Sequence, residues 1–347
     1  MGCFTRKING VSVSKKLLLQ EYAPKYICER KKLFFDLARK VHPKPEGEME
    51  ITRWGFDENG FEDGADFFDN CEFSTVPEYY DYKKDMSSRE RAVWYVNFAD
   101  FLLFGFYDDN KFAQDEIQTT EHPLLGSVVR YLDDKRFPDL VTETALVRNK
   151  ITAPYLVENV PYWVSINTSV KMPDGSVHNL YGRCFRNETE EVLHTGVKVV
   201  EENINDNIIA IAAPDDFYNE SYSATDIRYL METLLTSFSG ACKQSREKGA
   251  GEVVIHTGNW GCGAFGGNKV LTYLSQFIAG CLCGVDQLVF HAPDEGCFQE
   301  AREMFREFKE KVVLVGEDKA KGKVGSLKVV LEFLMGKGFK WSNSDGN

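Results

Sequence analysis

A glycine-rich segment, residues 257–267, has the composition of an anion-binding loop. It reads Thr-Gly-Asn-Trp-Gly-Cys-Gly-Ala-Phe-Gly-Gly, after a strand-like run at residues 253–256 and before residues 270–283, whose apolar spacing predicts a helix. Glycine lets the backbone approach a phosphate closely, and the free amides of a first helical turn point toward it. The segment therefore predicts a diphosphate site with a flat ring nearby, although it matches neither a P-loop nor a dinucleotide-binding fingerprint.

A second segment, residues 96–117, gathers carboxylates after another strand-like run. Those expected to converge near the end of that strand are Asp100, Asp108, Asp109 and Glu116. Carboxylates crowded together raise one another's pKa, so that one can stay protonated near neutral pH and act as an acid. The alternative is a capped, solvated helix start at Asp109. For Asp115, on the helical face expected to be exposed, both interpretations stand.

Strand and helix signals alternate from residue 92 onward. Strand-like runs cover residues 93–98, 160–166, 208–212, 253–256, 288–291 and 312–315. Helical spacing covers residues 111–132, 225–248, 270–283, 294–310 and 325–335. This alternation predicts an α/β fold, with a largely parallel or mixed sheet covered by helices on both faces.

The regions on either side of this pattern are expected to be accessory. Residues 1–90 predict a mostly helical layer, with helices over residues 15–26 and 28–41. Residues 91–339 form the α/β domain, and residues 340–347 are expected to be a flexible tail.

Composition excludes several classes of function. The chain has 347 residues and a formal net charge of −12, which disfavours binding to nucleic acid by phosphate neutralisation. An anionic ligand can still bind where backbone amides supply the field. No apolar run approaches the about 18–20 residues that cross a bilayer. Nine scattered cysteines and no evident signal peptide predict reduced thiols in an intracellular protein, cytoplasmic or nuclear, which we expect to be a monomer.

The two segments together resemble the poly(ADP-ribose) glycohydrolase (PARG) family, whose catalytic domain is a macrodomain. The glycine-rich segment is similar to the family's phosphate-binding loop. The family's second pattern is a strand ending Asp-Phe-Ala-Asn, a triple-glycine loop, and Gln-Glu-Glu at a helix start. This chain has Asn97-Phe98-Ala99-Asp100, then Phe104-Gly105-Phe106, then Gln114-Asp115-Glu116, with the same spacing between the first and last blocks. The resemblance covers roughly residues 92–339 and implies a macrodomain-like three-layer α/β/α fold.

The resemblance also implies roles for individual residues. The family's catalytic acid falls on Glu116, and Asp115 replaces the first Glu of the triplet. From the chemistry of the cleavage, and not from the resemblance, Asp100 is expected to orient the ribose or stabilise the developing cation. On the same ground, Asp108 and Asp109 are expected to hold the leaving group or activate water. Contacts to the diphosphate, ribose or adenine are expected from Gln114, Gly105, Phe106, Gly258, Asn259, Gly261, Cys262, Gly263, Ala264, Phe265, Phe217, Tyr218 and Phe290. For Phe290, a place in the buried core is the alternative.

Departures from the family pattern point to a particular leaving group. Phe104 and Phe106 replace two of the three glycines, which keeps that loop from approaching the diphosphate as closely. Asp108 and Asp109 stand where the family has small neutral residues. Because a carboxylate can hold a guanidinium bidentately, we expect hydrolysis of mono-ADP-ribose linked to arginine. The pattern is similar to a PARG-like branch of bacterial effectors that acts on arginine, including arginine on ubiquitin.

Two other functions compete with this expectation. The chain could cleave poly(ADP-ribose) despite the altered loop, or it could be an inactive reader that binds ADP-ribose and recruits a partner. In each case the expected partners are ADP-ribose and an ADP-ribosylated protein, not nucleic acid. No cofactor is expected. A divalent cation bridging Asp108 and Asp109 fits the charge pattern but is not predicted, and the histidines show no metal-ligand spacing.

Overall fold

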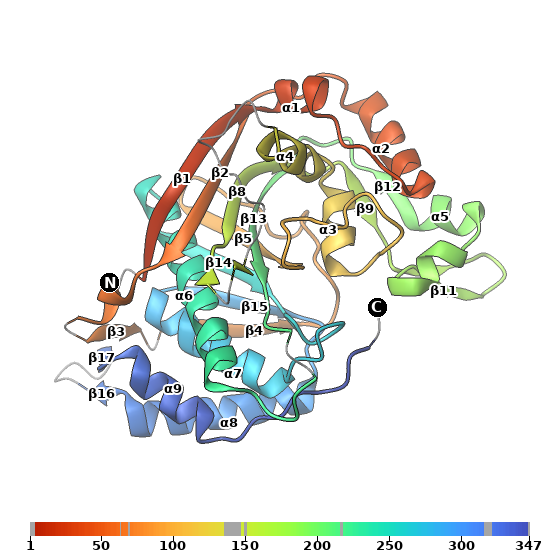
Figure 1. Ribbon diagram of the computed structural model, residues 1–347. Helices are drawn as coiled ribbons and strands as arrows, with labels where there is room; N and C mark the ends of the chain where they lie inside the picture. The colour runs from red at the N-terminus through yellow and green to blue at the C-terminus, as the bar shows by residue number, and fades with distance from the viewer. Residues whose placement is uncertain are drawn as a thin grey trace.

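A mixed β-sheet organises the chain (Figure 1). The computed structural model describes residues 4–62, 64–68, 70–134, 147–148, 151–215, 218–315 and 321–345. Among these, eight strands form the main sheet in the order β1 (Thr5–Ser14), β2 (Glu48–Phe56), β8 (Tyr155–Pro161), β13 (Asn205–Ala212), β5 (Arg91–Ala99), β14 (Glu252–Thr257), β15 (Gln287–His291) and β4 (Glu72–Val76). Strands β13, β5, β14, β15 and β4 run parallel, whereas β8 pairs antiparallel with β13. The carboxyl ends of the parallel strands therefore meet at one edge.

Alternating apolar side chains of the central strands bury both faces of the sheet. In β5, Trp94 and Val96 belong to one core cluster, and Val93 and Tyr95 belong to another on the opposite face. The first cluster is covered by α6 (Ala224–Glu247), α7 (Lys269–Cys283), α8 (Glu295–Val312) and α9 (Leu327–Met335). The other face lies beneath α1 (Lys15–Glu21), α2 (Glu29–Val41), α3 (Gln114–Glu121) and α4 (Leu124–Leu132). The expected α/β fold with helices on both faces is thus confirmed.

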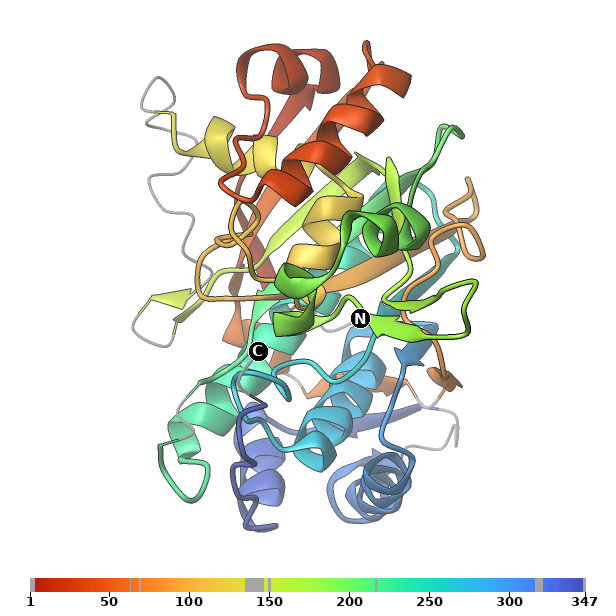
Figure 2. The ribbon, with the colours of Figure 1, turned by 90° about the vertical axis from the view of Figure 1, so that its right-hand side faces the viewer.

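A small lobe stands beside α2 and α3 (Figure 2). It contains β9 (Val164–Ile166), β10 (Ser169–Lys171), β11 (Val177–Asn179), η2 (Gly182–Asn187), α5 (Glu190–Gly196) and β12 (Val197–Val199). Its apolar centre includes Phe185 and Leu180, which cluster with Phe34 of α2 and with Phe112. The ring centroids of Phe112 and Phe185 lie 3.8 Å apart, so the lobe packs directly on the chain that leads into α3.

The remaining short elements lie outside the main sheet. They are η1 (Glu58–Phe61), the antiparallel sheet of β3 (Ala65–Phe68), β16 (Leu314–Val315) and β17 (Lys321–Val324), and the hairpin of β6 (Val147–Arg148) and β7 (Ile151–Thr152). No helix in the described part of the chain has the length and apolar character needed to cross a bilayer.

The predicted helices α6 to α9 are confirmed within two residues at each end, whereas other expected boundaries are wrong. The helix expected over residues 111–132 divides into α3 and α4 at His122 and Pro123, because proline removes a helical hydrogen bond and restricts the residue before it. The strand expected over residues 160–166 divides into β8 and β9.

The expectation of a mostly helical layer over residues 1–90 is also wrong. Helices α1 and α2 are present, but β1, β2 and β4 from this region join the main sheet. In β2, Met49 and Ile51 enter the core while Glu48 and Glu50 lie on the other face, an alternation typical of a half-buried strand that the helical expectation overlooked. Of the expected flexible tail, Trp341 packs on the domain, because its ring and that of Tyr222 stack with centroids 3.8 Å apart.

Removing residues 1–90 should unfold the protein and not release a free-standing domain. The deletion would strip β2 from β8 and β4 from β15, and would expose core that Trp54 and Tyr82 now cover. Near-ultraviolet circular dichroism and limited proteolysis of the 91–347 fragment would test this. A fragment that keeps a cooperative thermal transition would show the region to be accessory.

Candidate functional site

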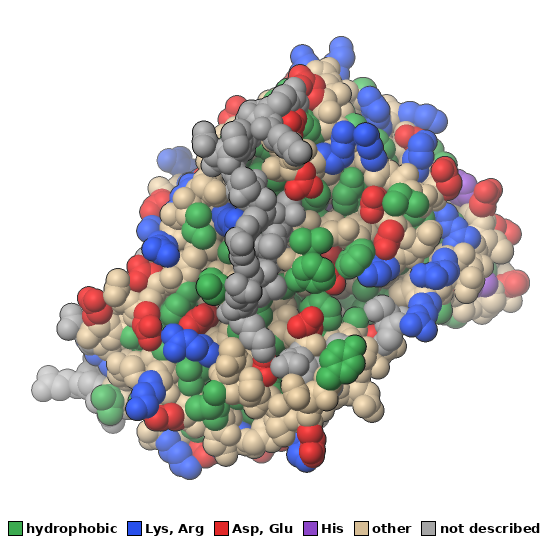
Figure 3. Space-filling model, viewed as in Figure 1, with side chains coloured by type: hydrophobic (Ala, Val, Ile, Leu, Met, Phe, Trp, Pro, Cys, Tyr) green, Lys and Arg blue, Asp and Glu red, His purple; other side chains and the backbone are tan. Residues whose placement is uncertain are grey.

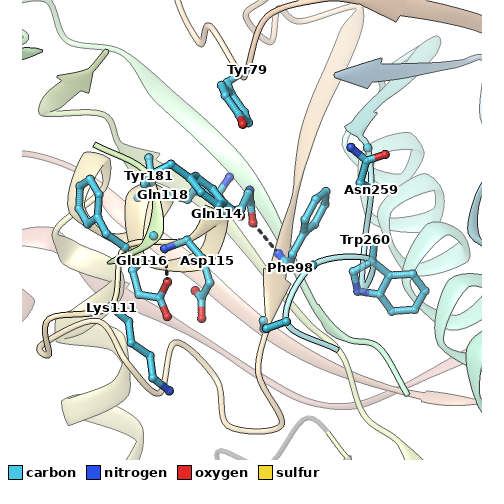
Figure 4. Close-up of a pocket in the computed structure, with 18 of the residues that line it drawn as sticks. Tyr79, Phe98, Lys111, Gln114, Asp115, Glu116, Gln118, Tyr181, Asn259 and Trp260 are labelled. Atoms are coloured by element: carbon cyan, nitrogen blue, oxygen red, sulfur yellow. Dashed lines mark hydrogen bonds between the residues drawn. The ribbon is translucent and has the colours of Figure 1, made fainter. Parts of the chain in front are cut away.

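A cavity of about 680 Å³ lies at the edge where the parallel strands end (Figure 4). Ala99 of β5, Thr257 of β14 and His291 of β15 all line it, together with Ala213 just after β13. A crevice at the carboxyl ends of parallel strands is the usual place for ligands in open α/β sheets, and this volume suits a small molecule.

The glycine-rich loop forms one side of the cavity. Its lining residues are Gly258, Asn259, Trp260, Gly261, Cys262, Gly263, Ala264 and Phe265. Gly261 has φ +72°, and a Cβ there would lie 2.4 Å from the Cβ of Ala213, so a larger residue would not fit. Within the described part of the chain, the amides of Gly263, Ala264 and Phe265 donate no hydrogen bond to protein. Three consecutive free amides in a curved loop are suited to holding an anion.

Polar side chains anchor this loop to the strands beneath it. Asn259 donates through Nδ2 to the carbonyl of Ala292 at 3.0 Å and accepts from the Tyr273 hydroxyl. Trp260 is buried, and its Nε1 donates to the carbonyl of Ile211 at 3.1 Å. Trp260 therefore supports the loop from below. Burial raises the pKa of the Cys262 thiol to about 12, which keeps it protonated and makes it a poor nucleophile.

A chain of buried histidines lies behind the loop. His256 Nδ1 and His291 Nε2 are 2.8 Å apart, and His256 Nε2 is 2.8 Å from Asp85 Oδ2. Burial, followed by the charge of His256, lowers the pKa of His291 to about 4, so His291 is neutral near physiological pH. The histidines join the ends of β14 and β15 and give the loop a fixed base.

Asp115 and Glu116 stand side by side on the opposite side of the cavity, across from Asn259 and Trp260 (Figure 4). They lie in the first turn of α3 and are 5 % and 4 % exposed, respectively. Burial and then the charge of Glu116 raise the pKa of Asp115 well above its usual value. Burial also raises the pKa of Glu116, against the opposing effect of Lys31. Two adjacent buried carboxyls with raised pKa values can provide both a proton donor and a base.

Hydrogen bonds fix the position of each carboxyl. Glu116 Oε2 accepts from the amide of Ala113 at 2.7 Å and so caps its own helix. Asp115 Oδ1 accepts from Asn97 Nδ2 at 3.0 Å, whereas its buried Oδ2 has no protein partner.

The expected cap at Asp109 is wrong, because α3 begins at Gln114 with Ala113 as its N-cap.

Gln114 and Asp100 complete this wall. Gln114 Oε1 accepts from the amide of Phe98 at 2.7 Å, and its Nε2 donates to the carbonyl of Val96 at 3.2 Å. Gln114 therefore ties α3 to the end of β5 while it lines the cavity. Asp100 also lines the cavity, and burial raises the pKa of its carboxyl.

The structure does not bring Asp108 and Asp109 to the cavity wall, contrary to the sequence analysis. The carbonyl of Asp108 accepts from the amides of Ile27 and Cys28, which turns this part of the loop toward α2. Asp109 Oδ1 accepts from the amide of Lys111 at 2.7 Å in a local turn. Sequence proximity to Glu116 therefore does not place these two carboxylates beside it.

The aromatic candidates for the adenine are also placed differently from expectation. Phe290 is fully buried in the core against Phe277 and Phe298, as the alternative interpretation held. Tyr218 is 89 % exposed and does not line the cavity. Phe217 lies outside the described residues.

The loop that replaces the triple glycine keeps an unusual backbone. Phe104 has φ +49°, a left-handed conformation that costs a non-glycine residue about 1–3 kcal/mol. Its ring is buried in the core and does not line the cavity. Gly105 does not line the cavity either, whereas Phe106 does. The ring centroid of Phe106 lies 3.0 Å from Lys111 Nζ.

Several wall residues were missed because they come from separate parts of the chain and form no local motif. The rings of Tyr79 and Tyr181 lie nearly parallel, with centroids 6.2 Å apart, at the cavity wall. Cationic side chains that line the cavity are Lys111, Arg183, Arg186 and Lys269. Lys and Arg side chains also gather over the lobe that carries η2 (Figure 3).

The C-terminal segment crosses the glycine-rich loop. The amide of Ser342 donates to the carbonyl of Gly266 at 2.8 Å, and that of Asp345 donates to the carbonyl of Gly263 at 3.4 Å. A carboxylate oxygen of Asp345 lies 3.1 Å from the position that a Cβ on Gly263 would take. The tail therefore places an acidic side chain at the amides suited to an anion.

No group of three or more His, Cys, Asp or Glu side chains in the described ranges is arranged to hold a metal ion.

Comparison with known proteins finds a family model that matches part of the chain. Residues 174–299, which include the glycine-rich loop but not Glu116, match a family model described as "Poly (ADP-ribose) glycohydrolase (PARG), Macro domain fold". No curated protein sequence matches the chain.

Solved structures similar to the chain include bacterial PARG enzymes. One is from Thermomonospora curvata, with 13 % identity, a TM-score of 0.45, and coverage of 83 % of this chain and 96 % of that one. Another is from Deinococcus radiodurans in complex with ADP-ribose, with 14 % identity, a TM-score of 0.38, and coverage of 81 % and 91 %, respectively.

Replacing Asp115 with Asn should make the protein relatively more stable as pH rises. A carboxyl whose folded pKa is raised stabilises the fold fully below its unfolded pKa, near 3.9, and loses that contribution as pH rises toward the folded value. Asn keeps the bond to Asn97 but does not ionise. The measurement is the free energy of unfolding in urea, taken for both proteins between pH 4 and pH 8. The value for Asp115→Asn minus the value for the parent protein should therefore increase as pH rises. A constant or falling difference would contradict the assigned pKa direction.

Proposed function

We propose that this PARG-like macrodomain protein is an ADP-ribosyl hydrolase, which cleaves the glycosidic bond between the anomeric carbon of ADP-ribose and a modified side chain. The observation that carries the proposal is that free loop amides and a buried carboxyl pair line the same cavity. The family model that matches residues 174–299 supports a glycosidase-type hydrolase.

The two walls suit different parts of ADP-ribose. The amides of residues 263–265 would bind the diphosphate, and Phe265 would pack against the ribose. Cleavage at an anomeric carbon passes through an oxocarbenium-like state, which requires negative charge near the sugar and a proton at the leaving group. Glu116 would donate that proton or activate water. Asp100 and Asp115 would stabilise the developing cation or adjust the charge around it.

For the leaving group, we propose arginine. The support is that Asp100, Asp115 and Glu116 line the cavity, where carboxylates can orient a guanidinium. Asp108 and Asp109, the residues first expected to do this, lie outside the wall, so the proposal depends on the other acids. Ubiquitin as the carrier remains an inference from family resemblance.

Poly(ADP-ribose) is a second candidate, favoured by the cations at the wall. Lys111, Arg183 and Arg186 could attract the phosphates of a neighbouring ADP-ribose unit. Incubating the protein with arginine-linked mono-ADP-ribosylated protein and, separately, with the polymer would decide between them, with free ADP-ribose as the readout. Release from the first supports arginine, and release from the polymer alone supports the alternative. Binding without release would indicate a reader.

Replacing Glu116 with Gln should lower turnover by about 10²- to 10⁴-fold, because an acid–base group is lost. Gln can still accept from the amide of Ala113, so the helix cap and ADP-ribose binding should be retained. Steady-state kinetics together with calorimetry would separate the two effects. Asp108→Asn is the matched control and should turn over at nearly the parent rate, because Asp108 lies outside the cavity wall. Equal losses in both variants would contradict this assignment.

Replacing Asp345 with Asn should tighten ADP-ribose binding by about threefold to tenfold, because the acidic tail lies where the diphosphate is expected to bind. Isothermal titration calorimetry at low and high salt would measure this. Glu220→Gln is a suitable control, since Glu220 pairs with Lys340 of the same tail. Unchanged affinity in Asp345→Asn, or an equal gain in the control, would place the diphosphate elsewhere.

A further inference from the structure

Lys31 is a buried lysine behind the acidic wall of the cavity. It belongs to α2, which lies alongside α3 (Figure 2), and its side chain is fully buried. An ammonium taken out of water is costly unless nearby groups compensate its charge. Its neighbours should therefore show why the fold retains a lysine at this position.

The ammonium of Lys31 binds the loop that leads from β5 to α3. Its Nζ donates to the carbonyl of Phe106 at 3.2 Å and to that of Tyr107 at 3.3 Å. The same atom lies 5.8 Å from the ring centroid of Phe112. These contacts hold the backbone just before the carboxyl pair, and they come from a region of the chain that carries no family motif.

Burial has the largest effect on the pKa of Lys31 and lowers it, whereas Glu116 and Asp115 of the cavity wall favour its charged form. Asp109, outside the wall, and Cys28, the N-cap of α2, act in the same direction as these two carboxyls. In return, Lys31 opposes the effect of burial on the pKa of Glu116. If Asp115 and Glu116 were both ionised, these two carboxylates and the Lys31 ammonium would together carry a net negative charge away from water. If only one carboxyl is ionised, its charge and that of the ammonium balance.

We propose that Lys31 is a positioning residue of this site. It fixes the loop before α3 by donating hydrogen bonds to two carbonyls of that loop, and it supplies the counter-charge to Glu116. The inference rests on the proposed function for its catalytic meaning, but its electrostatic part does not require turnover. Lys31 would keep one carboxyl ionised while the other stays protonated, so that an acid and a base are present together.

A double-mutant cycle on stability tests the charge pairing without any activity. Lys31→Met removes the charge and keeps an unbranched apolar chain, and Glu116→Gln removes the opposing carboxylate. We expect Lys31→Met to lower stability at pH 7 much less when Glu116 is already Gln, because that carboxylate is no longer left uncompensated. If Lys31→Met alone does not fold, its rescue by Glu116→Gln is the same result. Additive losses would overturn the proposal.

The pH dependence of kcat tests the catalytic part. Loss of the counter-charge should move the profile of Lys31→Met toward higher pH by about one unit, whereas KM changes less. Lys31→Arg should restore the profile. The control is Lys15→Met, since Lys15 is another buried lysine, bonded to Asn205 Oδ1 at 2.5 Å. An unchanged profile in a folded, active Lys31→Met protein, or the same shift in the control, would overturn the proposal. If the parent protein shows no hydrolysis, the proposed function is wrong. The double-mutant cycle on stability then tests the charge pairing of Lys31 with Glu116 by itself.

Discussion

The parallel pairing of β5 with β14 is the constraint on which the site depends. Their register, which sets Ile255 beside Trp94 and His256 beside Tyr95, brings the carboxyl ends of both strands to one edge of the sheet. The chain leaves β5 toward the carboxyls of α3 and leaves β14 through the glycine-rich loop. Segments more than a hundred residues apart in sequence therefore face one cavity. Helix α7, which follows the loop, is buried from Val270 to Cys283.

Charge burial distinguishes the two sides of the cavity. On the loop side, an anion would meet free amides beside the exposed carboxylate of Asp345. On the α3 side, Asp115 and Glu116 are held almost out of water, and hydrogen bonds orient each of them. Such burial disfavours the ionised form and so opposes stability at high pH. Retaining two such groups side by side is more readily explained by chemistry than by folding.

The sequence predicted the long helices and the central strands because their apolar period is clear. The structure also brings the glycine-rich loop and Glu116, which the sequence analysis singled out, to one cavity. The predictions from sequence failed where contacts between distant segments of the chain determine the structure. Asp108 and Asp109 turn away because their loop bonds to the chain before α2, and no local pattern reveals that bond. Lys31 and the tail could not be found for the same reason.

A crystal structure of the Glu116→Gln protein with ADP-ribose would test the central claim most directly. We expect the diphosphate oxygens to lie within hydrogen-bonding distance of the amides of residues 263–265, with the terminal ribose beside residue 116. The tail at Asp345 should be displaced from the loop. A nucleotide bound away from this loop, or a ribose that points away from α3, would contradict the account.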